Sequence, residues 1–160
     1  MRAVRRARAD EADRLHGVVP HENPAITVAA STEVLPGTFP GDLGIELLEI
    51  GEKAVRGRMR VDRRHLHPGG YVHGGCWVAL ADTVAAWGTM RHLPPDRGFT
   101  TAELKINVLG AGRPGDELLG VGELLHAGSR TQVWEVRVYR TQDGDASQPV
   151  ANFVCTQMVL

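Results

Sequence analysis

The chain has 160 residues, of which 42% are hydrophobic and 5% aromatic, and its formal net charge is −1. This length and hydrophobic content predict one domain with its own core, and no stretch of about 18 apolar residues is present to span a membrane. The nearly neutral charge and the scarcity of aromatic residues argue against nucleic-acid binding.

Residues 1–40 are expected to form an N-terminal arm and a lead-in segment ahead of the main domain at 41–160. Four arginines near the start are followed at once by acidic residues, without an apolar segment, so a signal peptide is not expected and a solvated helical arm is. Residues 20–41 hold four prolines and no clear period. They predict a lead-in that packs on the domain edge.

Six strands are predicted around one helix. Alternating and β-branched residues, bounded by turn residues, place the strands at 43–49, 53–61, 100–109, 117–125, 131–139 and 150–160. The first two are expected to form a hairpin, and further turns are expected at 112–116 and 142–145. Two strands, one long helix and four more strands indicate an α+β fold. A sheet of this size can surround a helix only if it curls.

The segment 76–90 reads CWVALADTVAAWGTM, and Asp82 is its only charged residue. Apolar residues cover nearly the whole circumference, which predicts a helix buried on all sides. An unpaired carboxylate would be costly there. Asp82 therefore either pairs with a distant group or has a chemical use, since burial and neighbours can tune a carboxyl pKa. This segment alone leaves both interpretations open.

A glycine-rich loop at 68–75 leads into this helix and ends in His73-Gly74-Gly75. The first turn of a helix has N–H groups without intrahelical partners and the positive end of the dipole. Gly74 and Gly75 would therefore offer donors to an anion or to a polarised carbonyl oxygen, as in an oxyanion site. The alternative is a turn that only lets the loop enter the helix.

Three segments, HGGCWVALADT, FTTAELKINVL and HAGSRTQVWEVRVYR, are similar in order and spacing to the hotdog-fold acyl-CoA thioesterases of the PaaI-like group. The resemblance covers roughly residues 40–160. It implies a hotdog fold, in which a curved antiparallel sheet of about six strands wraps a long central helix. It also implies a thioesterase that cleaves a small or aromatic acyl-CoA to the free acid and CoA, without a cofactor.

The resemblance assigns catalytic roles as well. The N–H of Gly74, which follows the motif residue His73, would polarise the thioester carbonyl, and Asp82 would act as base or nucleophile. Thr101, with Thr100 beside it, stands where the family often places a hydroxyl group that orients the attacking water.

Further residues are expected to contact the substrate. Arg130, with Ser129 beside it, stands where family members often hold the CoA phosphates, and Gly75 adds a second backbone donor at the helix start. Many members carry an Asn in the loop ahead of the HGG motif. This chain has none, so His67 is the suggested replacement.

Other functions can be weighed against this one. Three nearby histidines, His65, His67 and His73, suggest zinc, but no carboxylate or thiol joins them at a useful spacing beyond Asp62, so no metal is expected. A hotdog hydratase or dehydratase and a non-catalytic acyl-CoA binding module remain alternatives. The order of HGG and the downstream Asp82 favours hydrolysis over hydration, and a carboxylate in an apolar helix argues against a merely binding module.

Two distant cysteines, Cys76 and Cys155, do not make a disulfide framework and suit a cytoplasmic location. Cys76 stands near the helix start, where a thiol pKa can be lowered. A small buried hydrophobic role is nevertheless expected for it rather than a nucleophilic one.

Helix geometry predicts a dimer. Gly74 and Asp82 are eight residues apart, which is ~12 Å along a helix axis, yet both must lie within ~3–4 Å of one thioester carbon. Antiparallel helices from two subunits would place Gly74 of one chain opposite Asp82 of the other and create two composite sites. The resemblance also implies a homodimer, or a homotetramer made of two such dimers. From composition and charge, no nucleic-acid or membrane partner is expected.

Overall fold

A computed structural model describes residues 21–52, 54–141 and 148–160. The arm expected at the start of the chain and the turn expected at 142–145 lie outside the described residues. The helices and strands, in chain order, are α2 (Val28–Glu33), α3 (Phe39–Asp42), β1 (Ile45–Ile50), β2 (Ala54–Arg60), the short 3-10 helix η1 (Arg63–His65), α4 (Gly74–Arg91), β3 (Phe99–Val108), β4 (Glu117–Ala127), β5 (Thr131–Thr141) and β6 (Pro149–Val159). The long helix and six strands predicted from the sequence are confirmed.

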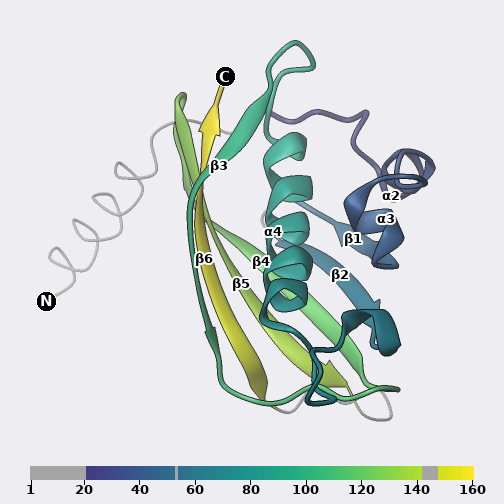
Figure 1. The fold of residues 1–160 in the computed structure, drawn as a ribbon. Helices are drawn as coiled ribbons and strands as arrows, with labels where there is room; N and C mark the ends of the chain where they lie inside the picture. The colour runs from purple at the N-terminus through teal and green to yellow at the C-terminus, as the bar shows by residue number, and fades with distance from the viewer. Residues whose placement is uncertain (1–20, 53, 142–147) are drawn as a thin grey trace, which may run out of the picture.

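The six strands form one antiparallel sheet in the order β1-β2-β4-β5-β6-β3. β1 and β2 form the expected hairpin, and β1 and β3 are the edge strands. The sheet curves around α4, which runs along its concave side (Figure 1). The α+β architecture implied by the resemblance, a long helix wrapped by a curved sheet, is therefore confirmed.

The core lies between α4 and the concave face of the sheet. Ten of the 18 residues of α4 are buried, and they pack against buried residues of β4, β5 and β6 that include Leu118, Trp134 and Phe153. Helix and sheet approach so closely that a Cβ atom at Gly88 would lie 2.3 Å from the ring of Trp134. Glycine is therefore needed there. Within the described residues, no helix is long and apolar enough to cross a membrane.

The prediction that α4 is buried on all sides is wrong for a single chain. Val78, Asp82, Ala86 and Met90 are only half-buried, and their spacing of four residues places them in one stripe along the helix. Asp82 in this stripe contacts β3, an edge strand on which Leu104 and Val108 are 40% and 45% exposed. A partly apolar strip beside Asp82 is thus left uncovered.

The lead-in contains two short helices that the sequence did not predict. Thr27 and Thr38 are their N-caps, and each side chain accepts a hydrogen bond from a backbone N–H three residues later. Helices of six and four residues are too short to produce a readable period. Both helices pack beside β1 (Figure 1). Farther upstream, the N–H of Asn23 donates to the carbonyl of Arg91 at 2.7 Å, which ties the lead-in to the end of α4.

Candidate active site

The first turn of α4 presents an unused backbone donor. His73 is the N-cap: its Nδ1 accepts the N–H of Gly75 at 2.9 Å, and its carbonyl accepts the N–H of Cys76 at 2.9 Å. The N–H of Gly74 has no hydrogen-bond partner among the described residues. A Cβ atom at Gly74 would meet nothing within 4 Å. Gly74 is exposed and has room beside it, so a ligand can approach this turn, where the helix dipole favours the negative charge that develops on a carbonyl oxygen.

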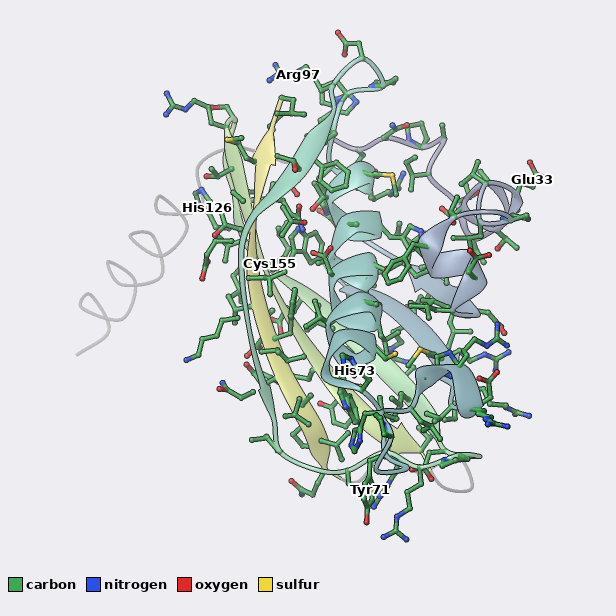
Figure 2. All side chains as sticks on the ribbon, viewed as in Figure 1. Glu33, Tyr71, His73, Arg97, His126 and Cys155 are labelled. Carbon is green, nitrogen blue, oxygen red and sulfur yellow. The ribbon has the colours of Figure 1, made fainter. Side chains whose placement is uncertain are left out.

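The cap also fixes the tautomer of His73. Because Nδ1 accepts a hydrogen bond, the neutral imidazole carries its proton on Nε2. The ring is exposed, and Figure 2 shows it at the end of α4 nearest the loop that carries Tyr71. His73 therefore offers a side-chain N–H donor at the start of α4, whereas the N–H of Gly75 is occupied by the cap and is not available.

A buried histidine positions this turn. His65 is 1% exposed; its Nδ1 accepts the N–H of Asp62 at 2.9 Å, and its Nε2 donates to the carbonyl of Leu43, also at 2.9 Å. The backbone carbonyl of His65 accepts the N–H of His73 at 2.8 Å. A hydrogen bond from Arg64 is the main reason that the pKa of Asp62 falls to about 2. His65 is thus a structural anchor for the N-cap, and its place three residues after Asp62 is a capping-box signal.

His67 lies in the same loop, six residues before His73. Its Nδ1 accepts the N–H of Gly69 at 2.9 Å, and its ring centroid is 6.0 Å from that of Tyr71. No group of three or more histidine, cysteine or carboxylate side chains in the described part of the chain could hold a metal ion.

The two cysteines are buried and free. Burial raises the pKa of Cys76, and it raises that of Cys155 to about 11. The thiolate is therefore disfavoured at Cys76 despite its place near the helix start.

Asp82 is half-buried and meets side chains from two strands. The hydroxyl of Thr101 on β3 lies 3.0 Å from Asp82 Oδ1, and Gln157 on β6 donates its Nε2 to the same oxygen at 3.3 Å. Thr101 Oγ1 is also 3.1 Å from Gln157 Oε1, so the three side chains form a closed triangle. Asp82 Oδ2 has no partner among the described residues. One carboxylate oxygen is held in place and the other is available for chemistry.

Gln157 was not identified from the sequence. It is 0% exposed and pairs in register with Thr101. A signal was present: alternate residues 151, 153, 155, 157 and 159 of the last strand face the core, and Gln157 is the one amide among them. Thr100 points to the opposite face of β3, where it is exposed, and does not join the cluster.

Ser129 and Arg130 occupy the turn between β4 and β5, and both are exposed. The carbonyl of Arg130 accepts the N–H of Val159 at 2.9 Å, while its guanidinium forms no ion pair with any carboxylate of the described residues. Ser129 lines a cavity that also includes Arg97. Figure 2 places Arg97 and His73 at opposite ends of α4. The predicted phosphate-binding residues therefore lie beyond Asp82, far from Gly74 of the same chain.

Comparison with known proteins identifies the family. Residues 69–147 match the family model described as the thioesterase superfamily. The 1,4-dihydroxy-2-naphthoyl-CoA hydrolase of Escherichia coli (strain K12) is 31% identical over 114 residues, which are 71% of this chain and 83% of that protein. The chain belongs to the thioesterase superfamily. It is a thioester hydrolase.

Solved structures agree with this assignment. The PaaI protein from the phenylacetic acid degradation operon of E. coli has a TM-score of 0.71 at 23% identity, covering 82% of this chain and 90% of that one. The smu.793 protein of Streptococcus mutans UA159, solved bound to acetyl CoA, has a TM-score of 0.65 at 26% identity, covering 72% and 88%. The hotdog fold and the resemblance to the PaaI-like group are confirmed.

Proposed function

We propose that the protein hydrolyses a small or aromatic acyl-CoA to the free acid and CoA. The observation that carries this proposal is the pairing, on one helix, of an open backbone donor at Gly74 with a carboxylate, Asp82, whose Oδ2 is free. A relative is named as a hydrolase of an aromatic acyl-CoA, and a structural neighbour was solved with acetyl CoA. Both support CoA thioesters as the substrate class.

The proposed mechanism assigns each group one task. The Gly74 N–H binds the thioester oxygen as it becomes an oxyanion, and the Nε2–H of His73 adds a second donor beside it. Asp82 Oδ2 either takes a proton from water as the water oxygen attacks the carbonyl carbon, or attacks that carbon itself to give an anhydride that water then cleaves. In the first route the carbon–sulfur bond breaks and the proton held by Asp82 passes to the leaving sulfur. In the second route the sulfur leaves as a thiolate, and the proton released when water cleaves the anhydride converts it to the thiol. Thr101 orients Asp82 and the water.

The active site is proposed to be shared between two chains. Within one chain, Gly74 and Asp82 are separated by ~12 Å of helix, too far to act on one carbon. The stripe formed by Val78, Asp82, Ala86 and Met90 is uncovered, and β3 beside it is an edge strand with unpaired backbone groups. A second copy packed antiparallel against this strip would cover it and bring its own Gly74 opposite Asp82.

The remaining contacts are assigned to the coenzyme. We propose that Arg130 and Ser129 bind CoA phosphates, because this exposed guanidinium has no carboxylate partner in the described residues and arginine matches phosphate geometry. His67 is proposed to replace the loop Asn of the family. Free, buried cysteines support a cytoplasmic location.

The direct test is thiol release from a panel of acyl-CoAs, followed with a thiol-reactive dye. The wild-type protein should release CoA from small or aromatic members, whereas a hydratase or a binding module releases none. Asp82→Asn should lower kcat by about 10²–10⁴-fold, because the amide keeps the shape of the side chain but neither accepts a proton nor attacks. Glu33→Gln removes an exposed carboxylate from α2 and serves as the control with unchanged turnover. If the kcat of Asp82→Asn stays within a few-fold of the wild-type value, the role of Asp82 is structural.

A further inference from the structure

Gln157 has the most enclosed position of the three side chains in the Asp82 cluster. Its strand, β6, lies between β5 and β3 in the sheet, and Gln157 pairs in register with Gln132 on one side and with Thr101 on the other. The side chain of Gln157 is 0% exposed, whereas Asp82 and Thr101 are half-buried. The strand that carries Gln157 is therefore held on both sides, while β3, the edge strand that carries Thr101, is held on one.

The neighbours of Gln157 determine which end of its amide faces Asp82. Nε2 lies 3.3 Å from Asp82 Oδ1 and 3.4 Å from Cys155 Sγ, and Oε1 lies 3.1 Å from Thr101 Oγ1. An ionised carboxylate only accepts hydrogen bonds, so a flipped amide would place two acceptor oxygens against each other. Burial is the main reason that the pKa of Cys155 rises to about 11, so its sulfur stays neutral. The nitrogen end of the amide therefore faces Asp82.

The two donors at Asp82 Oδ1 differ in how freely they are available. The Thr101 hydroxyl has one proton and two acceptors within reach, Asp82 Oδ1 at 3.0 Å and Gln157 Oε1 at 3.1 Å. Gln157 Nε2 has two protons, one for Asp82 and one for the sulfur of Cys155. Gln157 is therefore the donor that stays on Asp82 whichever acceptor the Thr101 proton takes.

A fixed oxygen matters because the carboxylate of an aspartate turns about a soft terminal torsion. Both donors meet Oδ1 of Asp82, and Oδ2 has no partner among the described residues. A turn of the carboxylate would break both hydrogen bonds at once. The two donors thus keep Oδ1 on the sheet side and leave Oδ2 as the oxygen that reacts.

We propose that Gln157 is a positioning residue of the hydrolysis, which holds Asp82 Oδ1 with its amide nitrogen and accepts the Thr101 hydroxyl when Asp82 loses its charge. The inference rests on the function proposed above, in which Asp82 is the base or the nucleophile. Asp82 becomes neutral when Oδ2 takes a proton from water, or when it forms the anhydride. Its Oδ1 is then a weaker acceptor, and the Thr101 hydroxyl rotates to Gln157 Oε1. The proton stays bonded to Oγ1 throughout.

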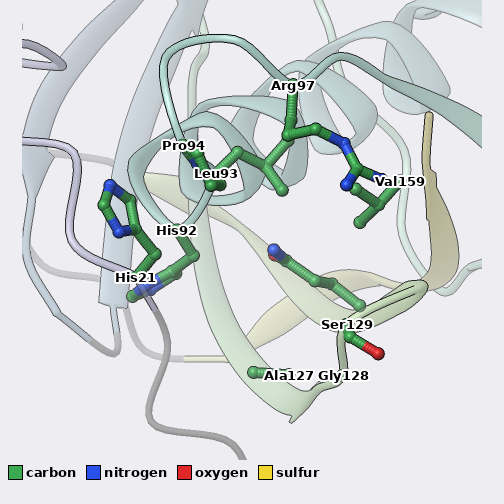
Figure 3. Close-up of a pocket in the computed structure, with 10 residues that line it drawn as sticks. His21, His92, Leu93, Pro94, Arg97, Ala127, Gly128, Ser129 and Val159 are labelled. Atoms are coloured by element: carbon green, nitrogen blue, oxygen red, sulfur yellow. The ribbon is translucent and has the colours of Figure 1, made fainter.

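Gln132 offers a matched comparison on the neighbouring strand. It pairs in register with Gln157 and therefore points to the same face of the sheet. It is 2% exposed, and its Oε1 accepts the indole N–H of Trp134 at 3.3 Å. Gln132 lines a cavity of about 260 Å³ at the C-terminal end of α4, which Figure 3 shows with His92 at its side. The lining of this cavity includes none of the three side chains of the Asp82 cluster, all of which the structure describes.

The test compares Gln157→Met with Gln132→Met, because methionine is similar in length to glutamine and lacks both polar ends of the amide. Gln157→Met should lower kcat about 10- to 100-fold, as for the loss of a hydrogen bond to a charged group, with KM within a few-fold of wild type. Gln132→Met should leave kcat unchanged. If Gln157→Met loses no more turnover than Gln132→Met, Gln157 does not position Asp82.

Gln157→Glu adds a result that a merely structural role would not produce. Two adjacent carboxyl groups share one proton. At weakly acidic pH the introduced carboxyl is therefore protonated and donates to Asp82, and at higher pH it is ionised and repels Asp82. The kcat of this variant, relative to wild type, should fall as pH rises. Besides burial, Asp82 and Glu103 raise the pKa of Cys155; these neighbours are the same in both proteins and cancel in the ratio. A ratio that is constant with pH contradicts the inference.

Other outcomes separate the inference from the proposed function. An Asp82→Asn protein with wild-type turnover would overturn the proposed function, and the inference with it. A strongly impaired Asp82→Asn beside a fully active Gln157→Met would overturn the inference alone. If neither Gln157 variant folds, the side-chain amide signals of wild type and Asp82→Asn are compared by NMR. The Gln157 signal should shift and the Gln132 signal should not, and an unchanged Gln157 signal would contradict the inference.

Discussion

The two ends of α4 differ in the exposure of their unpaired polar groups. At the N-terminal end, His73 caps the N–H of Gly75 and leaves that of Gly74 free, in a position that is exposed and open. At the C-terminal end, His92 is buried and both its ring nitrogens lack partners among the described residues. Water can satisfy the free donor at Gly74 at little cost, whereas the ring nitrogens of His92 are closed off from bulk solvent. The first end thus presents an accessible backbone donor, and the second presents a buried imidazole.

At the N-terminal end of α4, the Gly74 N–H can be removed by a substitution that keeps the local backbone shape. Gly74 is the first residue of the helix, where proline is favoured, and His73 has φ −65° and ψ 141°, which suits a residue before proline. Gly74→Pro should therefore fold, delete the donor N–H and lower kcat by about 10²–10³-fold, as for loss of one oxyanion donor. Gly74→Ala keeps the N–H and has room for its Cβ. Equal losses in Pro and Ala variants, measured by thiol release, would show that the N–H is not used.

In the middle of the helix, loss of the Thr101 hydroxyl beside Asp82 should lower kcat less than loss of the Gly74 N–H. Thr101→Val removes the hydroxyl that holds Asp82 Oδ1, and a hydrogen bond to a charged group is worth about 1.5–3 kcal/mol. We expect kcat to fall by about 10- to 100-fold while KM stays within a few-fold. Thr101→Ser retains the hydroxyl and should recover most of the rate. If valine and serine variants both match wild type, the orientation of Asp82 depends on Gln157 alone.

Substitution of His92, at the C-terminal end of α4, should have the smallest effect, and that effect is on the stability of the protein. Because burial lowers the pKa of His92 in the folded protein, the unfolded chain binds one more proton as pH falls below the ordinary histidine value of 6.5. The contribution of His92 to stability is thus fully present above that value and decreases as pH falls toward the lowered pKa. Urea unfolding of His92→Phe between pH 7.5 and 5 should show a shallower decline than wild type. An identical decline would mean that the pKa of His92 is the same in both states.

Local patterns explain what the sequence could predict. The helix, the HGG motif and Asp82 all lie within one short segment, so periodicity and spacing were enough to find them. Gln157 contacts Asp82 across 75 positions of sequence, and His65 contacts Leu43 across 22. Such pairs depend on how the sheet curls and how the lead-in packs, which no local pattern encodes. The uncovered stripe on α4 was missed for a related reason: its apolar residues look the same whether the core or a second chain covers them.

The central claim is that Gly74 of one chain and Asp82 of another make one site. It is tested by mixing Asp82→Ala and Gly74→Pro proteins, each carrying a different affinity tag, under refolding conditions. Each homodimer should be inactive. Half of the randomly formed dimers are mixed, and each has one site with neither defect, so the mixture should recover about a quarter of the wild-type activity per chain. Mixed dimers that are captured through both tags and yet release no thiol would contradict the shared site.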